Sequence, residues 1–379
     1  MSRARDDACP GALQVHQGAD GPLVRIRLPG GMITAGQLDV LAETATKFGD
    51  GGLQLTSRGN VQLRGLTNPR AVADAVAGAG LLPSPTHERV RNIIASPLTG
   101  RAGGEGDLRP VVTALDEAIR ARPGLADLPG RFLFGLDDGT GDVSGLAADA
   151  GVRLTGDGAA LLLAGRHTGC RLGTGEVPEA LVTVAARFVE TRGQAWRIAE
   201  LDDPDALLDG FAVGGQGPPP TVTPAIRPPV GWIVQDDGRV ALGAAVPLGV
   251  LSARQARFVA AIGAPVVITP WRSLLVCDLD EGVADTALRV LAPLGLVFDA
   301  GSRWIGVSAC VGSPGCGRSR ADVRAEAARV AQGVGPESPP GSLPVHYAGC
   351  ERACGRPAGA RVLIATGGGY LPVVGRTRS

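Results

Sequence analysis

The chain has 379 residues, 37 basic and 37 acidic side chains, and 44% hydrophobic residues. It is long enough for two or three modules with buried cores, and its zero net charge gives no reason to expect a nucleic-acid partner. No apolar run reaches the roughly 18 residues that span a bilayer, and residues 1–10 lack the apolar core of a signal peptide. We therefore expect a cytoplasmic protein without a membrane partner, whose cysteines stay reduced.

Arginine supplies nearly all of the positive charge, because Lys47 is the only lysine. The base composition of a GC-rich genome is a sufficient explanation. Arginine is also the residue that holds carboxylates through two parallel hydrogen bonds. The composition is therefore compatible with a ligand that carries several carboxylates.

The first predicted unit runs strand, helix, strand. Apolar and charged residues alternate over 23–28, which predicts a half-buried strand. Thr34 and Gln37 have the spacing of a capping box at the start of a helix that ends near Gly49. A second strand is predicted at 53–55 and continues, after a turn, at 61–64.

The same unit returns in the second half of the chain. Residues 29–37 align without a gap with 247–255, and Ser252 and Gln255 repeat the capping box. This similarity indicates an internal duplication. Neither strand–helix–strand unit could bury its apolar face alone, so we expect the two units to pair.

A longer segment separates the repeats. Arginines alternate with apolar residues at 89–91, which predicts an extended stretch with Arg89 and Arg91 on one face. The aspartate-rich turn at 137–142 lacks the glutamate of an EF-hand and is interpreted as a solvated hairpin loop. Further predictions are helices at 108–122 and 178–192, a buried strand at 128–135, a hairpin at 152–163, and a helix opening at Ser319.

Four of the seven cysteines lie in the last fifth of the chain, in the pattern C-x5-C (Cys310, Cys316) followed by C-x3-C (Cys350, Cys354). Thiolates are the ligands that iron–sulfur clusters need. Zinc is the chemical alternative but favours about two to four intervening residues. The wider loop favours a [4Fe–4S] cluster over zinc and over inert thiols. The other three cysteines are interpreted as inert: Cys9, Cys170 and Cys277.

These motifs resemble those of the sirohaem nitrite and sulfite reductases, over about residues 11–374. The matching stretches are residues 55–65 (Leu-Thr-Ser-Arg-Gly-Asn-Val-Gln-Leu-Arg-Gly), 309–316 and 346–354. Within that superfamily the chain is most similar to the precorrin-3B synthase family of aerobic cobalamin (vitamin B12) biosynthesis.

The resemblance implies an α+β fold with a duplicated nitrite/sulfite reductase-like architecture around a tetrapyrrole cleft. The implied domains are a ferredoxin-like half-unit at 11–85, a larger α+β tetrapyrrole-binding module at 86–213, a linker at 214–230, a second half-unit at 231–297, and a second α+β module at 298–379 that carries the cluster.

The implied function is that of an O2-dependent monooxygenase that converts precorrin-3A to the hydroxy-lactone precorrin-3B. Its partners would be the tetrapyrrole, O2 and an external electron donor, either NADH or a ferredoxin or flavodoxin system. Its cofactors would be the [4Fe–4S] cluster and a mononuclear non-haem iron. The sequence identifies neither the ligands of that iron nor the catalytic residues.

The main alternative is a ferredoxin-dependent nitrite or sulfite reductase, in which the Cys354 thiolate would bridge to the iron of sirohaem. Those enzymes use a lysine pair on one strand, whereas the matching strand here offers Arg131 and then Leu133. A third possibility is an electron-transfer protein without catalytic activity.

The resemblance also supplies candidate substrate-binding residues. Arg58, Asn60, Gln62 and Arg64 lie in the motif that lines the tetrapyrrole pocket. Arg89, Arg91 and Arg131 are candidate clamps for the acetate and propionate carboxylates, with Arg272 as a weaker candidate. Each arginine could instead be an exposed surface residue.

His346 stands four residues before Cys350. It is a candidate ligand of the mononuclear iron. A hydrogen bond to a cluster sulfur, or a place in the core, is the favoured interpretation.

Overall fold

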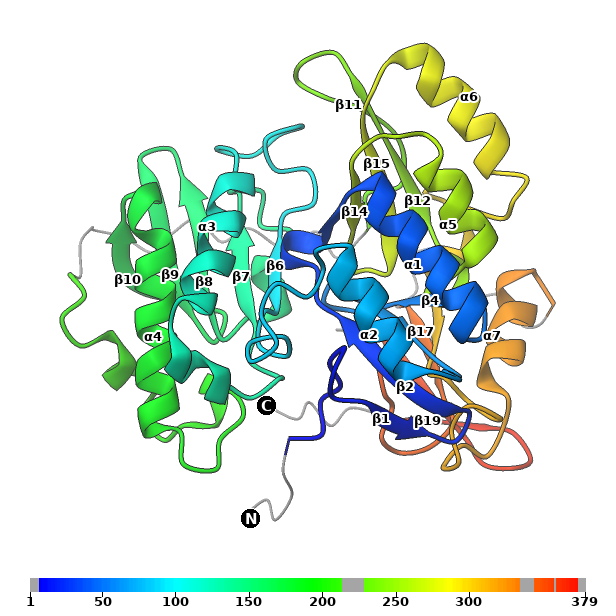
Figure 1. The fold of residues 1–379 in the computed structure, drawn as a ribbon, viewed down its shortest axis with the longest axis horizontal. Helices are drawn as coiled ribbons and strands as arrows, with labels where there is room; N and C mark the ends of the chain where they lie inside the picture. Colours follow the sequence, from blue (N-terminus) through cyan, green and yellow to red (C-terminus); the bar gives the residue numbers. More distant parts are fainter. Residues whose placement is uncertain (1–6, 213–227, 335–343, 358, 374–379) are drawn as a thin grey trace.

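The computed structural model describes residues 7–212, 228–334, 344–357 and 359–373, which form four β-sheets and the helices that cover them (Figure 1). The α+β class is as predicted. Most of the predicted linker lies outside the described residues. Within the described ranges, no helix is both long and apolar enough to cross a membrane.

The two half-units have the same order of elements. Both predicted capping boxes are confirmed, because the side chains of Thr34 and Gln37, and of Ser252 and Gln255, each bond the other residue's backbone N–H. The first half-unit contains β1 (His16–Gly18), β2 (Gly21–Ile26), β3 (Met32–Ile33), α1 (Ala35–Phe48), β4 (Gly52–Leu55), β5 (Val61–Leu63) and α2 (Pro69–Gly78). The second contains β11 (Gly231–Val234), β12 (Val240–Ala245), β13 (Val250–Ser252), α5 (Ala253–Ala260), β14 (Val266–Ile268), β15 (Ser273–Leu279) and α6 (Glu281–Leu291).

The half-units pair by exchanging a strand. The first sheet has the order β1-β2-β5-β4-β13, and the second has the order β11-β12-β15-β14-β3. Strand β13 of the second unit therefore completes the first sheet, and β3 of the first unit completes the second. Helices α1 and α5 lie side by side over the two sheets (Figure 1), and apolar residues of both units form one core. The expected pairing is confirmed.

Gly31 lies where the two half-units meet. Its φ is +71°, and a Cβ there would lie 2.0 Å from the carbonyl oxygen of Ile268 on β14. We predict that Gly31→Ala lowers the free energy of unfolding by at least about 2 kcal/mol, because both the backbone angle and the contact exclude a side chain. Gly36→Ala is the control, since nothing lies within 4 Å of its Cβ position. It should be neutral or stabilising by about 0.5–1 kcal/mol in chemical denaturation. Equal effects of the two substitutions would contradict the prediction.

The two larger modules share a sheet topology. In the first, β6 (Ile93–Ala95), β7 (Phe134–Asp137) and β8 (Ala150–Thr155) are parallel, β9 (Gly158–Leu163) and β10 (Arg166–Leu172) continue antiparallel, and the helices are α3 (Arg109–Arg120) and α4 (Val177–Thr191). In the second, β16 (Val307–Ala309), β17 (Val345–Ala348) and β18 (Arg361–Ala365) are parallel, β19 (Tyr370–Val373) is antiparallel, and the helix is α7 (Val323–Ala331). Each helix α3 and α7 follows the first strand of its sheet, so the duplication extends to these modules. The predicted domain boundaries stay predictions.

Three local predictions need correction. The stretch at 89–91 is not extended: a turn occupies residues 85–90, and β6 begins only at Ile93. The strand predicted at 128–135 begins at Phe134, because Phe132 N–H closes a turn onto Pro129 O. The last helix begins at Val323 with Asp322 as its N-cap, and the hydroxyl of Ser319 donates to a backbone carbonyl instead.

Candidate functional site

The two cysteine motifs meet at the carboxyl ends of two strands of the last sheet, which we call the cysteine edge. Strands β16 and β17 are parallel neighbours, so their carboxyl ends lie together. Cys310 directly follows β16, and Cys350 follows β17 after Gly349. The N–H of Gly349 donates to the Cys310 sulfur at 3.2 Å. A Cβ on Gly349 would lie 1.8 Å from the hydroxyl oxygen of Ser319, so the two loops can approach this closely only with glycine there.

Three of the four cysteines act electrostatically on the fourth, Cys354. Loss of solvation raises the pKa of Cys354, and the negative charge of Cys310, Cys350 and Cys316 raises it further, while Arg352 opposes the shift. Cys354 is nevertheless the one of the four that is exposed, whereas the other three are half-buried. The structure thus gathers the four cysteines that the sequence predicted as ligands.

The spacing of these sulfurs suits a cluster better than a zinc ion. Within the described chain, the only three ligand-type groups that lie within 4.8 Å of one another are carboxylates of the first larger module, so no three cysteine sulfurs come that close. Four sulfurs on zinc, with bonds of about 2.3 Å, would lie about 3.8 Å apart. The larger iron–sulfur cube needs wider spacing.

A buried guanidinium nitrogen beside the cysteines also fits an anionic cluster. Arg324 on α7 has an Nε atom without a partner among the described residues. Burial lowers its pKa, the nearby Arg64 adds to that shift, and Cys310 is among the negative groups that oppose it. A cluster with four thiolate ligands carries net negative charge, which would stabilise this guanidinium.

His346 is fully buried on β17. Its Nδ1 lies 3.0 Å from the hydroxyl of Ser308 on β16, and its Nε2 has no hydrogen-bond partner in the described residues. Burial, followed by the charge of Arg272, lowers its pKa to about 4, although the backbone of Cys354 opposes the shift. The ring is therefore neutral and lies beside the cysteine loop, in keeping with the favoured interpretation.

A polar face of the first sheet leads away from this edge. Gln62 on β5 stands in register with Arg25 on β2 and Gln54 on β4. Its Oε1 accepts from Arg25 at 3.0 Å, and its Nε2 lies 3.4 Å from Gln54 Oε1. Asn60 is buried, and its side-chain oxygen accepts from the N–H of Leu28 at 2.9 Å. It therefore holds the backbone just after β2, and its side-chain oxygen is not free.

Arg64 and Arg58 mark the two ends of this face. Arg64 holds Asp20 through two bonds of 2.8 and 2.7 Å and also donates to the carbonyl of Gly315, beside Cys316. Arg58, at the opposite end, donates to the carbonyls of Gly130 and Arg131 in the first larger module. The sheet face therefore runs from the first module to the cysteine loop.

The sequence did not indicate that Arg25 and Arg27 form an arginine cluster on this face. Arg27, just after β2, is only 2% exposed, and its Nε and Nη1 have no partner among the described residues. Burial lowers its pKa to about 9, with Arg25 and Arg58 adding to the shift and Cys9 opposing it. Arg25 and Arg27 each donate to the Cys9 sulfur at 3.4 Å. Cys9 is thus not an isolated inert thiol. Cys170 and Cys277 are buried as expected.

The remaining candidate arginines have protein partners. Arg91 is 5% exposed and forms a two-bond ion pair with Asp116 on α3, so we leave it out of the proposed pocket. Arg89 donates to the carbonyl of Asp7 and pairs with its carboxylate at 3.6 Å. Arg131 is exposed, and its guanidinium lies 5.0 Å from the ring centre of Trp196.

The weaker candidate Arg272 is half-buried and donates to the carbonyl of Gly355, just past Cys354. Its φ is +57°, an uncommon angle for a residue with a side chain. In register with the first repeat it occupies the place of Gly59, because Thr269 bonds Ser273 as Thr56 bonds Asn60. It therefore belongs to the cysteine edge rather than to the arginine cluster.

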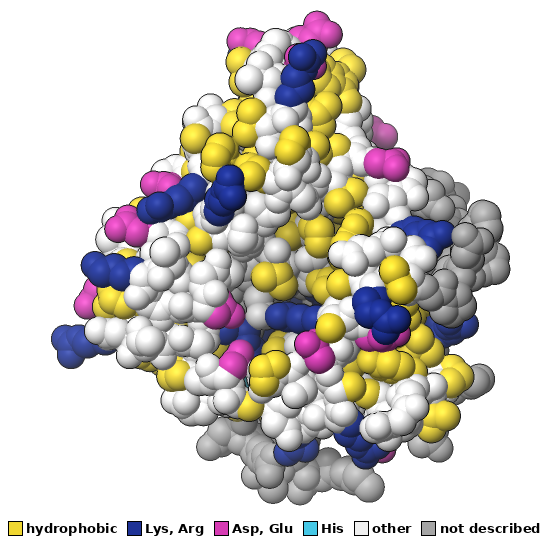
Figure 2. All heavy atoms as spheres, turned by 90° about the vertical axis from the view of Figure 1, so that its right-hand side faces the viewer, with side chains coloured by type: hydrophobic (Ala, Val, Ile, Leu, Met, Phe, Trp, Pro, Cys, Tyr) yellow, Lys and Arg dark blue, Asp and Glu magenta, His cyan; other side chains and the backbone are white. Residues whose placement is uncertain are grey.

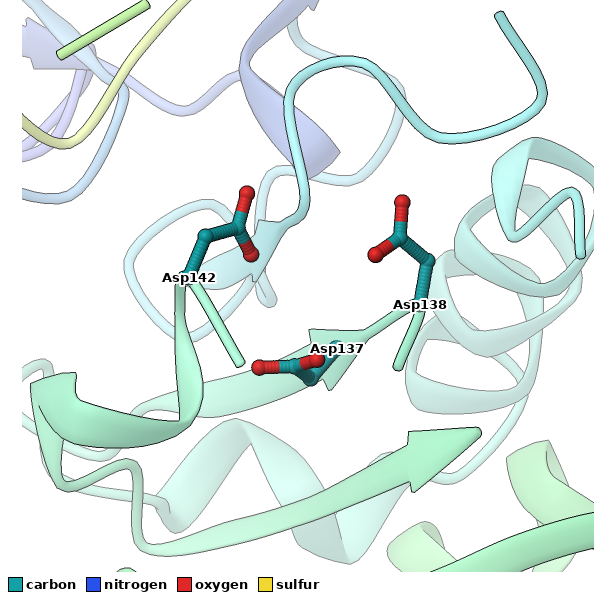
Figure 3. Close-up of side chains that lie close together, drawn as sticks. All are labelled: Asp137, Asp138 and Asp142. Atoms are coloured by element: carbon teal, nitrogen blue, oxygen red, sulfur yellow. The ribbon is translucent and has the colours of Figure 1, made fainter. Parts of the chain in front are cut away.

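Three carboxylates converge at the end of β7: Asp137, Asp138 and Asp142 (Figure 3). The loop is not solvated as predicted, since Asp137 and Asp138 are each 1% exposed. Asp137 accepts four bonds from Gly139, Gly141 and Ser144, so the turn's own donors use its oxygens. No histidine joins the group, and the described residues contain no convergent set of two histidines and a carboxylate for a mononuclear iron.

Asp142 makes this turn sensitive to pH. Burial raises its pKa to about 7, and the charges of Asp137 and Asp138 add to the shift, while a bond from Ser96 opposes it. The folded chain therefore holds a proton that the unfolded chain loses near pH 4, and stability falls as the pH rises towards 7.

We predict that Asp142→Asn is more stable than wild type, by a margin that grows about 1–2 kcal/mol between pH 5 and pH 8. Denaturation curves at both pH values measure this. Asp157→Asn, at an exposed site, should show no such growth, and a constant margin for Asp142→Asn would contradict the prediction.

A hollow of about 700 Å³ lies elsewhere, between the end of α4 and residues 200–209. None of the predicted site residues lines it. The candidate residues Arg58, Gln62 and Arg64 lie on the polar face of the first sheet and not in this open hollow.

Comparison with known proteins agrees with this fold. Residues 16–73 match the family described as the nitrite/sulfite reductase ferredoxin-like half domain. The solved structure of the Mycobacterium tuberculosis NirA protein superposes with a TM-score of 0.78 over 98% of this chain and 77% of that protein, at 21% identity. That likeness shows the fold.

Sequence relatives fall in the same group. A precorrin-3B synthase of Sinorhizobium sp. is 29% identical over 99% of this chain and 84% of its own length. A ferredoxin-dependent sulfite reductase of Mycobacterium tuberculosis is 25% identical over 80% of this chain and 61% of its own length. A ferredoxin–nitrite reductase of Leptolyngbya laminosa matches at 34% identity, but over only 29% of this chain and 23% of its own length. The chain therefore has the nitrite and sulfite reductase fold and resembles precorrin-3B synthase over nearly its whole length.

Proposed function

We propose that the protein is a tetrapyrrole oxidoreductase of the precorrin-3B synthase type, with a [4Fe–4S] cluster on Cys310, Cys316, Cys350 and Cys354. The substrate would be precorrin-3A, oxidised with O2 to the hydroxy-lactone precorrin-3B. One oxygen atom would enter the substrate and the other would leave as water, which consumes electrons and protons from an external donor.

One observation carries the proposal: a buried polar face joins the arginine cluster to the cysteine loop. Arg64 lies at the cysteine end of that face, where it pairs with Asp20 and donates to the carbonyl of Gly315 beside Cys316. A ligand on this face would therefore lie beside the cysteines. Buried guanidinium groups without carboxylate partners need an anion, and a tetrapyrrole with many carboxylates supplies it.

The chain's own residues would bind and orient the substrate. Arg27 and Arg25 retain buried N–H groups that no described residue satisfies, and these would hold a carboxylate in a site with little water. Gln62 fixes the Arg25 side chain through its 3.0 Å bond. When bound, the cluster supplies one-electron transfer. No described ligand set fits a mononuclear iron, so we assign no residue to it.

The face of the molecule drawn in Figure 2 shows no strongly charged patch. On the face drawn in Figure 2, basic side chains stand among acidic and apolar ones. The electron donor, whether NADH or a small redox protein, therefore stays unassigned.

The test is anaerobic purification, measurement of iron and acid-labile sulfide, and then reaction of precorrin-3A with isotopically labelled O2 and a chemical reductant. We expect labelled oxygen in the product. A product without label would refute the monooxygenase.

A sirohaem reductase is the second candidate, because a sulfite reductase matches 80% of the chain. Strong red absorption bands in the purified protein, together with sulfite or nitrite reduction, would establish it. Leu133 argues against this candidate, because it is 5% exposed within an apolar cluster at the place where those enzymes were expected to carry a second lysine.

A further inference from the structure

Residues 7–9 lie directly against the arginine cluster. The Cys9 sulfur accepts from Arg25 and Arg27 at 3.4 Å, and its thiol donates to the carbonyl of Gly130 at 3.4 Å. The Asp7 carboxylate accepts from the N–H of Gly130 at 2.5 Å and pairs with Arg89. Residues 7–9, the tip of this segment, thus occupy the hydrogen-bond donors that a ligand carboxylate would need.

The following residues are anchored separately. The carboxylate of Glu88 accepts from the backbone N–H groups of Ala12, Leu13 and Gln14 at 2.5–3.1 Å. A Cβ on Gly11 would lie 2.3 Å from a Glu88 oxygen, so glycine is required at the start of the anchor. The anchor can therefore stay in place while residues 7–9 move.

The contacts of the tip are weaker than those a ligand would offer. A thiol sulfur is a weak acceptor, whereas a carboxylate on a guanidinium forms a charge-assisted bond about twice as strong as a neutral one. Arg27 also keeps two nitrogen atoms unpartnered while Cys9 is in place. A carboxylate that reached Arg27 could satisfy both.

We propose that residues 7–9 form a strap that closes the arginine cluster in the free protein and is displaced by a carboxylate of the bound tetrapyrrole. This inference rests on the proposed function and adds its regulation. Asp7 and Cys9 stand in for the anionic group of the ligand. Binding exchanges them for the ligand without moving the anchor at Glu88.

Alkylation of Cys9 tests the displacement. The full-length protein is treated with iodoacetamide, with and without uroporphyrin III as an air-stable polycarboxylate probe, and the Cys9 peptide is quantified by mass spectrometry. We expect alkylation of Cys9 to be several-fold faster with the probe, while the buried Cys170 is unchanged. Slower alkylation with the probe would make Cys9 a fixed wall of the pocket and would overturn the strap.

A strap variant supplies the second measurement. The double substitution Asp7→Asn with Cys9→Ala should bind uroporphyrin III several-fold more tightly, with faster association, by fluorescence quenching. Leu13→Ala is the control, because that side chain is exposed and its anchoring N–H is retained. If the double variant does not bind the probe, the proposed function fails and the strap with it. If the wild type and the double variant bind the probe equally, and the probe does not change the rate of Cys9 alkylation, the strap alone is refuted.

Discussion

Replacing Cys310 by serine is expected to abolish the brown absorption of the anaerobically purified protein and to reduce its iron and acid-labile sulfide to background. In the proposed site each of the four thiolates would hold one corner of the cube, and a hydroxyl is a poor substitute for a soft thiolate. The Cys310 sulfur also accepts a hydrogen bond from the N–H of Gly349, which orients it. Cys316→Ser and Cys350→Ser should behave in the same way.

Cys170→Ala is the matched control for this experiment. Its thiol is buried in the core of the first larger module, away from the cysteine loops, so the variant should keep full iron and sulfide. Circular dichroism distinguishes loss of the cluster from general misfolding, because the half-units and the first module do not depend on the cluster for their cores. A wild-type protein that binds zinc and contains no sulfide would refute the assignment.

The sequence predicted local features well because spacing along the chain determines them. The capping boxes at Thr34 and Ser252 need only a side chain three residues away, and both are formed. The pairing of the two units followed from the repeat, since each unit has an apolar face that needs a partner, but the exchange of β3 and β13 was not predicted. The convergence of the cysteines followed from their spacing around a short strand–helix–strand segment.

The arginine cluster could not be predicted, because it depends on contacts between distant segments. The alternation at 23–28 correctly indicated a strand, but whether Arg25 and Arg27 face solvent depends on what covers that side. Residues 7–9 and the turn at Gly130 cover it. One signal was available: polar residues alternate on both β2 and β5, which are antiparallel neighbours.

The partner of Arg91 could not be predicted for the same reason. That partner, Asp116, lies 25 residues further along on α3, and nothing in the alternation at 89–91 indicates that pair. An arginine in a motif can bind a ligand or hold two elements together, and only the tertiary structure separates these roles.

We expect the replacement of Arg27 by methionine to stabilise the fold and to weaken the proposed tetrapyrrole binding. Burial lowers the pKa of Arg27 to about 9, so keeping the side chain charged at neutral pH costs free energy in the folded state. An apolar side chain of similar length removes that cost, and we expect the free energy of unfolding to rise by about 1–3 kcal/mol. Loss of a charge-assisted bond to a carboxylate should weaken uroporphyrin III binding about 10- to 100-fold.

The pH dependence gives an independent check with a definite sign. Above about pH 9 and below the much higher pKa of a solvated arginine, the unfolded chain binds more protons at this site than the folded chain does, so the wild type gains stability as the pH rises. The stability advantage of Arg27→Met should therefore narrow above pH 9. Arg257→Met, at a half-exposed arginine 3.8 Å from Asp39, should change stability by less than about 0.5 kcal/mol and leave probe binding unchanged. A less stable Arg27→Met protein that still binds the probe normally would show that Arg27 supports the fold and not the ligand.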